Sequence, residues 1–185
     1  FLDKVYAPLI DTQVGALFWC IGEHAARWPT NELEMLGEVH GRRYENASAY
    51  IHTENIRRML ERGEDPQKAL IDRGRELGID VYASVRMNDN HFNGAQIKDL
   101  ASLHHTELTQ LRIEHPDWLL GDRTSEWFAL SWDMSILEVR EHRLAHIREL
   151  CTQYDWDGVE LDWQRHAFHL PTDEAYRLRY VITDL

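Results

Sequence analysis

The chain has 185 residues, of which 43% are hydrophobic, and its formal net charge is -12. This length allows one domain with a real core, but a complete eight-stranded barrel of alternating strands and helices needs about 250 residues. The acidic charge argues against nucleic-acid binding, which depends on Lys and Arg contacts to phosphates, and the sequence has no apolar run of transmembrane length.

The first predicted strand spans residues 14–20 and lies in a continuous apolar run from Val14 to Ile21. Such a run is typical of a strand that is buried on both faces. A loop rich in Gly, His and Trp follows, and a helical pattern begins at Thr53. The order of strand, loop and helix is the first unit of an α/β pattern.

The next helix has clear signals at both ends. Asp65 is the predicted N-cap, Pro66 takes the first helical position, and the helix ends at Leu77 before Gly78. A strand over residues 79–86 follows directly, as in the short joins of α/β folds. This strand alternates, with an apolar face formed by Val81, Ala83 and Val85.

A long excursion between strands covers residues 87–135, and segments of this kind are usually functional. It contains a predicted helix over 96–115 and a break at 116–118. An amphipathic helix over 136–153 follows, with one apolar side formed by Leu137, Leu144, Ile147 and Cys151. It leads to a third strand at 158–163.

Two carboxylates share one face of this third strand. Strand side chains alternate, so Glu160 and Asp162 point one way, while the apolar face is formed by Val159, Leu161 and Trp163. The apolar face can pack under helices. The acidic face must look into a polar cavity, because burying an unpaired charge is costly.

Polar residues follow the ends of the second and third strands: Arg86, Asn88, Asp89 and His91 after one, and Glu160, Asp162, Arg165 and His166 at the other. If the two strands are parallel, these groups converge at one edge of the sheet, where ligands bind in α/β folds. A guanidinium there keeps a carboxylate ionised, while a carboxyl group in a drier place stays protonated. The alternative is a structural ion pair that closes the top of the sheet.

The chain contains seven tryptophans, which is a high number for its length. Several fall in predicted loops, where the rings could stack on sugars: Trp28, Trp118, Trp127 and Trp132. Each could instead anchor its loop. Together they favour a carbohydrate ligand.

Eleven histidines make metal binding the rival interpretation. The sequence has no His-Glu-x-x-His motif, and His142 and His146 are four residues apart but surrounded by arginines. We therefore predict no metal site and no cofactor. Cys20 and Cys151 are predicted to be buried thiols rather than a disulfide.

The motifs Arg86-Met87-Asn88-Asp89 and Asp157-Gly158-Val159-Glu160-Leu161-Asp162-Trp163-Gln164-Arg165-His166 give the chain a family resemblance. It resembles bacterial glycoside-hydrolase-like TIM-barrel proteins, related to the family 10-like glycosyl hydrolases. The resemblance runs over most of the chain. It implies a barrel fold and hydrolase activity.

The third-strand motif also looks like the Asp-Gly-x-Asp-x-Asp-x-Glu signature of family 18 chitinases. Here Glu160 replaces the middle Asp, and Gln164 stands where the catalytic acid would be. A neutral amide cannot donate that proton, so a working chitinase of this type is not expected. A sugar-binding relative without activity is an open alternative.

We therefore expect a single incomplete domain over residues 1–185, formed by the N-terminal strands and helices of a (β/α)8 TIM barrel. Asp162 is the expected nucleophile or base for hydrolysis of a glycosidic bond, with Glu160 in support and Asp89 as the one local candidate for the second carboxyl group. Substrate binding is assigned to Arg86, Asn88, Asp89, His91, Trp163, Arg165 and His166.

Two other functions stay open: a catalytically inactive carbohydrate-binding barrel, and a metal-dependent hydrolase of another bond type. The expected partner is an oligosaccharide or polysaccharide. Because the sequence starts at Phe1 and residues 172–185 read as a helix without a cap, we expect a fragment, which would self-associate through open sheet edges. A leader before residue 1 would make the protein secreted or periplasmic.

Overall fold

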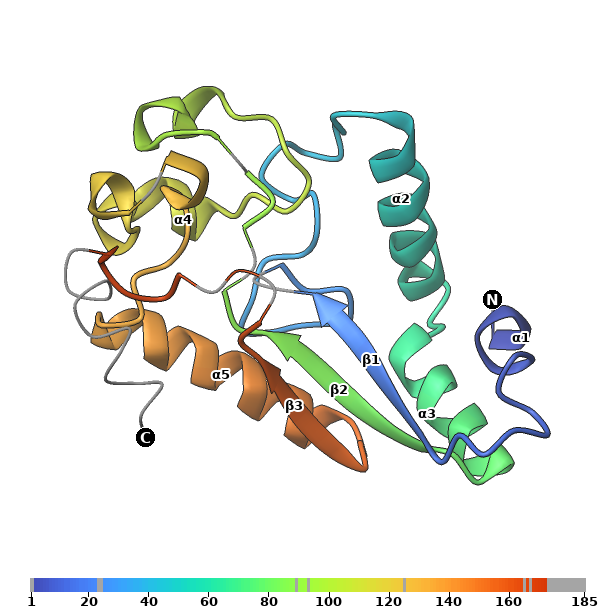
Figure 1. Ribbon diagram of the computed structural model, residues 1–185. Coiled ribbons are helices and arrows are strands. Elements are labelled where there is room, and N and C mark those ends of the chain that lie inside the picture. Colours follow the sequence, from blue (N-terminus) through green and yellow to red (C-terminus); the bar gives the residue numbers. More distant parts are fainter. Residues whose placement is uncertain are drawn as a thin grey trace, which may run out of the picture.

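A small parallel sheet organises the chain. The computed structural model describes residues 2–22, 25–88, 90–92, 94–124, 126–164, 166 and 168–172. Its three strands are β1 (Ala16–Gly22), β2 (Asp80–Arg86) and β3 (Gly158–Asp162), and they are hydrogen-bonded in the order β1-β2-β3 (Figure 1). Both pairings are parallel. The predicted α/β class and the parallel arrangement of the second and third strands are therefore confirmed.

The first strand differs from its prediction in position and burial. It begins at Ala16 rather than Val14, whose side chain is 42% exposed, and it continues to Gly22. The expectation that both of its faces are buried is wrong, because Phe18 is 53% exposed. The physical reason is that Phe18 lies on the sheet face opposite the helices, which the described residues leave partly uncovered.

Helices precede and separate these strands: α1 (Leu2–Tyr6), α2 (Ala47–Glu61), α3 (Pro66–Leu77), α4 (Gln110–Glu114) and α5 (Leu137–Gln153). The predicted limits of α3 are confirmed, since Asp65 accepts hydrogen bonds from the amides of Gln67 and Lys68, and Gly78 closes the helix with φ 68°. In contrast, α2 starts six residues before Thr53, because Asn46 caps it by accepting from the Ala49 amide at 2.9 Å.

The single helix predicted over 96–115 is wrong. The structure has a short 3-10 helix at Ile97–Ser102, a loop, and then α4. Thr109 interrupts the helical pattern by capping α4, and Glu45 holds the loop by accepting from both the amide and the hydroxyl of Thr106. Further 3-10 turns follow at Pro116–Trp118, Gly121–Arg123 and Glu126–Phe128. The helix predicted over 172–185 lies outside the described residues apart from Thr172.

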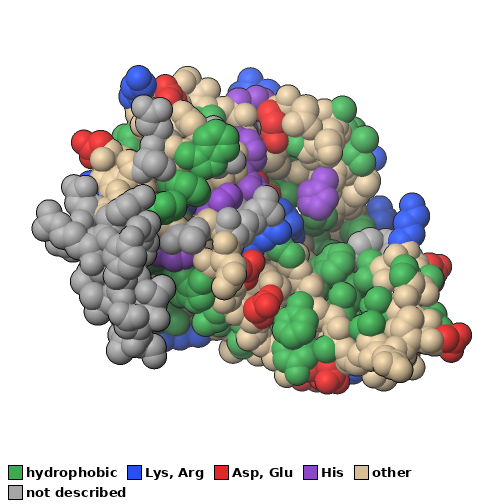
Figure 2. Space-filling view, in the orientation of Figure 1, with side chains coloured by type: hydrophobic (Ala, Val, Ile, Leu, Met, Phe, Trp, Pro, Cys, Tyr) green, Lys and Arg blue, Asp and Glu red, His purple; other side chains and the backbone are tan. Residues whose placement is uncertain are grey.

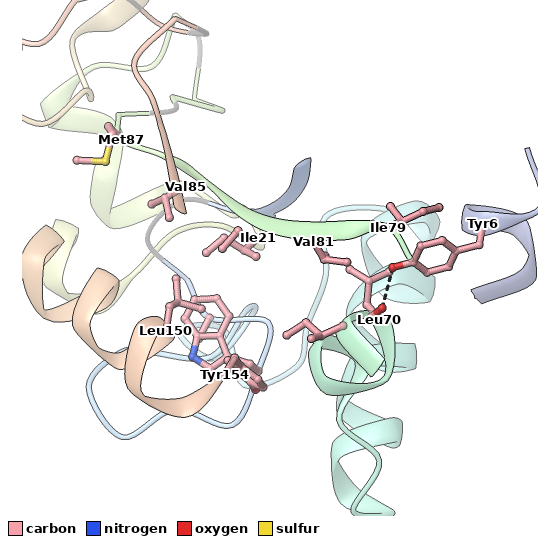
Figure 3. Packing of buried hydrophobic residues seen from close by; sticks show 13 residues of the cluster. Tyr6, Ile21, Leu70, Ile79, Val81, Val85, Met87, Leu150 and Tyr154 are labelled. Atoms are coloured by element: carbon pink, nitrogen blue, oxygen red, sulfur yellow. Dashed lines mark hydrogen bonds between the residues drawn. The ribbon is translucent and has the colours of Figure 1, made fainter. Parts of the chain in front are cut away.

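The main core lies between the sheet and the helices on one of its faces. Figure 3 shows its side chains, which come from β1, β2, α1, α3 and α5: Tyr6, Ile21, Leu70, Val81, Val85 and Leu150 are among them. As predicted, the apolar face of β2 is fully buried, with Val81, Ala83 and Val85 all 0% exposed. Gly74 lets α3 approach β2 closely, because a Cβ there would lie 2.3 Å from Val81 Cγ2.

The predicted apolar side of α5 is buried only in part. Ile147 packs against the main core, but Leu137 and Leu144 are 54% and 47% exposed, and Cys151 is also exposed. The buried side chains are Val139, Arg143, His146 and Leu150. Apolar spacing misplaced this face because two of its residues are polar and find partners inside: Arg143 donates to the Arg86 carbonyl at 2.8 Å and contacts His146 Nδ1 at 3.0 Å.

The long excursion after β2 has a core of its own. Eight buried residues form it: Phe92, Leu100, Leu108, Leu119, Leu130, Trp132, Met134 and Val139. The buried Arg112 guanidinium lies between two of these rings, 4.7 Å from the centre of Phe92 and 4.9 Å from that of Trp132. Stacking on both ring faces stabilises a cation inside this cluster. The excursion is therefore a packed layer above the sheet ends.

One carboxylate of α5 shapes the loop that follows β1. Glu149 accepts hydrogen bonds from Trp28 Nε1 at 3.2 Å, Thr30 Oγ1 at 2.6 Å and the Asn31 amide at 2.7 Å. The Trp28 ring also stacks on His146. These contacts join residues more than a hundred positions apart and fasten the loop to the helix.

The face of the sheet opposite the helices stays partly open. Phe18, Tyr82 and Gly158 are register partners there, and Phe18 stacks on Tyr82 with ring centres 4.8 Å apart. Gly158 makes room for the Tyr82 ring, since a Cβ would lie 2.4 Å from its Cε1.

Among the described residues, every helix is too short or too polar to cross a membrane.

Candidate functional site

The C-terminal ends of the three strands lie at one edge of the sheet, below the excursion that follows β2 (Figure 1). The register places Arg86 at the end of β2 directly opposite Asp162 at the end of β3. Register partners in a parallel pair project to the same face. The structure therefore brings these two predicted residues to neighbouring positions, and both side chains are half-buried.

Backbone and turn contacts fix the ends of these strands. The Met87 amide donates to the Asp162 carbonyl at 2.9 Å, and the Asp162 carboxylate accepts from the Gln164 amide at 2.9 Å. Arg143 of α5 holds the Arg86 carbonyl from the helix side. Glu160 lies one step back on the same face as Asp162, opposite Ser84, and it is exposed. The acidic residues of β3 thus point to the face that the helices leave open.

Asn88 is buried, with 2% exposure, and its amide bridges two segments. Its Nδ2 donates to the carbonyls of Trp132 and Phe168 at 2.8 Å and 3.1 Å, and its Oδ1 accepts from the Trp132 amide at 2.9 Å. All these bonds lie inside the protein. Asn88 therefore holds the excursion and the segment after β3 against the end of β2.

The other residues predicted at this edge are spread over two segments. His166 Nδ1 accepts from the Asn90 amide at 2.6 Å, so the segments after β2 and β3 do meet. Trp163, next to Asp162, is 41% exposed, with its ring edge-on to His169. Asp89 and Arg165 lie outside the described residues.

His91 belongs to a polar hollow that sequence reasoning did not find. This histidine pocket has a volume of about 250 Å³ and is lined by Leu36, Glu45, Asn46, Ser48, Ala49, His52, Thr53, His91, His105, Thr106 and Glu107. His91 Nδ1 lies 3.9 Å from Glu107 Oε1, which accepts from Arg27 at 2.5 Å. Figure 2 shows histidine and arginine side chains gathered around a hollow near the middle of the visible face.

The histidine pocket sits at the same edge of the sheet as Asp162. Arg27 packs on the end of β1, where a Cβ on Gly22 would lie 3.2 Å from its Nε, and His91 follows β2. The other lining residues come from the loop between β1 and α2, from the start of α2 and from the loop before α4. The sequence signal was weak, because these residues are spread along the chain and Arg27 and Glu107 are 80 positions apart.

The ionisation states in the histidine pocket follow from burial and neighbouring charge. Burial and the Arg27 charge lower the pKa of His52, and burial lowers that of His105, so both imidazoles are neutral at pH 7. Burial opposes ionisation of Glu45, but hydrogen bonds from Thr106 outweigh it and lower the pKa of this carboxyl group. The pocket therefore combines the neutral imidazoles of His52 and His105 with the ionised carboxylate of Glu45.

The interpretation of the loop tryptophans as exposed sugar platforms is wrong for two of them. Trp28 and Trp132 are 0% and 1% exposed and belong to the two cores. Trp118 is half-buried and stacked on His115, while Trp127 is 54% exposed. Loop position alone misled here, because each of the two buried rings is covered by residues distant in sequence.

The sequence predicts neither a metal site nor a disulfide. Within the described ranges, no group of three or more His, Cys, Asp or Glu side chains is arranged to hold a metal ion. His146 is fully buried. Its Nδ1 lies 3.0 Å from Arg143 Nη1, and its ring stacks on Trp28. Both cysteines are free, but the prediction that both are buried is wrong, since Cys20 is half-buried and Cys151 is exposed.

Comparison with models of known protein families gives no match, and comparison with curated proteins gives none either.

Proposed function

We propose that the protein hydrolyses a glycosidic bond at the C-terminal edge of its parallel sheet, with Asp162 as the nucleophile or the base. One observation carries the proposal: the register sets Asp162 opposite Arg86 at that edge. An ionised carboxylate is the form that attacks an anomeric carbon or activates water, and Arg86 supplies a cationic side chain at the neighbouring position. Ligands of α/β proteins bind at this edge of a parallel sheet.

The fold supports a barrel as the architecture of this site. In a (β/α)8 barrel, helices cover the outer face of each parallel strand, and the inner face looks toward the barrel axis. Here the helices pack against Val81, Ala83 and Val85, while Phe18, Tyr82 and Glu160 lie on the opposite face. We propose that the three strands form part of such a barrel and that Glu160 and Asp162 face its interior.

A sugar ligand also suits the surroundings of Asp162. Trp163 is the next residue and is 41% exposed, so its ring is accessible for stacking on a sugar. Glu160, exposed on the same strand, offers a carboxylate that accepts hydrogen bonds from sugar hydroxyls. These residues act as binding and supporting groups in the proposal.

The decisive experiment compares Asp162→Asn with Asp155→Asn in the full-length protein. Asp155 precedes β3 at the other end of the strand, is 85% exposed and contacts Arg75, so it controls for the loss of one charge. Turnover of nitrophenyl glycosides or polysaccharides should fall at least about a thousandfold in Asp162→Asn and stay unchanged in Asp155→Asn. Sugar binding should persist in both variants, because the interaction removed acts in the transition state.

Equal turnover in wild type and Asp162→Asn would exclude Asp162 as a catalytic residue. Saturable sugar binding without turnover in any form would replace hydrolysis by the alternative of a catalytically inactive carbohydrate-binding barrel. A covalent glycosidase inhibitor that labels the wild type but not Asp162→Asn would assign the nucleophile.

A further inference from the structure

The histidine pocket lies beside the proposed catalytic edge but shares neither Asp162 nor Arg86. Its volume of about 250 Å³ is below the roughly 300 Å³ at which pockets for drug-sized ligands begin, so it suits a small ligand. Its walls come from four places: the loop between β1 and α2, the first turns of α2, the loop before α4, and the segment after β2.

Glu107 supplies a hydrogen-bond acceptor in this pocket. Its side chain is 10% exposed, and Oε1 accepts from Arg27 at 2.5 Å. Within the described part of the chain, no group donates to Oε2, although this atom is buried. A buried carboxylate oxygen without a donor is costly, so a ligand that brings an O–H or N–H group gains by binding there.

His105 supplies a donor. Its Nδ1 accepts from the Glu107 amide at 3.1 Å, so the proton of the neutral ring sits on Nε2. The first turn of α2 adds further donors, because the first amides of a helix have no partner within it and Asn46 takes only that of Ala49. The pocket therefore presents fixed acceptors and fixed donors together.

The charges of the pocket are largely paired or absent. Arg27 binds Glu107, and His52 and His105 are neutral at pH 7 because burial lowers the pKa of each. Glu45 is held by hydrogen bonds from Thr106, and His91 lies 3.9 Å from Glu107. The pocket therefore suits a neutral ligand with hydroxyl groups that both donate and accept.

We propose that the histidine pocket binds one neutral sugar ring, with Glu107 accepting from a ring hydroxyl and His105 donating to another. The assignment of the ligand as a sugar rests on the proposed function, whereas its size, neutrality and hydroxyl content follow from the pocket itself. The bound ring occupies a subsite beside the scissile bond and is held by the loop after β1, α2 and the loop before α4.

Two variants of the full-length protein test the pocket. Glu107→Gln keeps an oxygen for Arg27 but replaces the free acceptor by an NH2 group. Because it also weakens a buried charge-assisted bond, its melting temperature should fall, and binding is measured at a temperature where the variant is folded. Ala49→Leu fills the pocket from α2, where Ala49 is one of the lining residues. Ala47→Leu is the matched control, because Ala47 is an exposed residue in the same first turn that does not line the pocket.

Binding of glucose, xylose and N-acetylglucosamine is measured by calorimetry in the presence of EDTA. At least one sugar should bind with a millimolar dissociation constant, and Glu107→Gln and Ala49→Leu should each weaken it about tenfold or more, while Ala47→Leu leaves it unchanged. Asp162→Asn should also leave the dissociation constant for the sugar unchanged. In a hydrolysis assay, Glu107→Gln should raise KM and spare kcat, unlike Asp162→Asn.

Three results would overturn the proposal: no binding of any of these sugars, equal sugar binding in Glu107→Gln and wild type, or saturation of the pocket by methylammonium or a divalent metal ion in place of sugar. Saturable, Glu107-dependent sugar binding by a wild-type protein without glycosidase activity would overturn the proposed hydrolysis and support the sugar pocket. The two proposals therefore fail separately.

Discussion

Glu54 shows how a single carboxylate of α2 ties down the turn that precedes the helix. Its side chain is 8% exposed and accepts from Arg42 Nε at 2.7 Å and from the Tyr44 hydroxyl at 2.6 Å. Hydrogen bonds from Arg42 and Tyr44 lower the pKa of this carboxyl group to about 2. Charge-assisted bonds of this kind are stronger than neutral ones.

We expect Glu54→Gln to lower the free energy of unfolding by about 1–3 kcal/mol at pH 7, because a buried charge-assisted network is broken. Since the folded-state pKa of Glu54 is depressed from 4.5 to about 2, its ionised form stabilises the fold above 4.5, and this contribution is lost as pH falls toward 2. The difference between wild type and variant should therefore shrink over that range in urea melts.

Glu61→Gln is the matched control for this experiment. Glu61 also contacts Arg42, at 2.9 Å, but its side chain is 57% exposed. Exposed ion pairs contribute about 0–1 kcal/mol, so this variant should behave nearly as wild type. Equal losses in the two variants at neutral pH would show that burial of Glu54 does not matter.

At the residue scale, strand parity and a parallel sheet were enough to predict that Arg86 and Asp162 lie at neighbouring positions. The ion pair between Arg27 and Glu107 could not be predicted in the same way. Both residues lie outside helices and strands, so no periodicity points to them. Their contact depends on how two long loops pack over the sheet ends.

At the element scale, α5 shows where periodicity fails. Its buried side carries Arg143 and His146, and its exposed side carries Leu137 and Leu144. A sequence pattern scores apolar residues as buried, but here internal hydrogen bonds and stacking on Trp28 accommodate the polar ones. In contrast, the ends of α3 were predictable because Asp65, Pro66 and Gly78 act through local backbone geometry.

The orientation of α5 gives a sharp test. Leu150→Ala should lower the free energy of unfolding by about 2–5 kcal/mol, because Leu150 is 0% exposed within the main core and its truncation leaves a cavity. Leu144→Ala, on the same helix and 47% exposed, should cost about 0.5 kcal/mol or less. Chemical denaturation followed by circular dichroism measures both. A larger loss for Leu144→Ala would mean that the helix is rotated.

At the scale of the whole molecule, the sheet is open at both edges within the described residues, since β1 and β3 each pair only with β2. The sequence predicted three strands and their direction, and it is right on both points. It could not predict the open face, because an apolar residue such as Phe18 reads as buried wherever it occurs. Burial depends on what covers the face.

We expect the 185-residue chain by itself to self-associate through these edges, because unpaired strand edges and exposed Phe18 favour pairing with another chain. Light scattering after size-exclusion chromatography should give a mass above 21.9 kDa that falls on dilution. Phe18→Lys should shift the protein toward monomer. Ile51→Lys on α2, where Ile51 is 58% exposed, is the control and should not.

A single monomeric mass for wild type at every concentration would contradict this prediction. Association that persists in Phe18→Lys but disappears in Ile51→Lys would move the contact from the sheet to α2.

The hydrogen bonds from the loop after β1 to Glu149 have a consequence for folding during synthesis. The loop leaves the ribosome more than a hundred residues before the carboxylate that holds Trp28, Thr30 and Asn31. At elongation rates of about 5–20 residues per second, the loop waits for several seconds with the large Trp28 side chain uncovered. During that interval Trp28 is a ready target for a chaperone, and the translation of α5 ends the exposure.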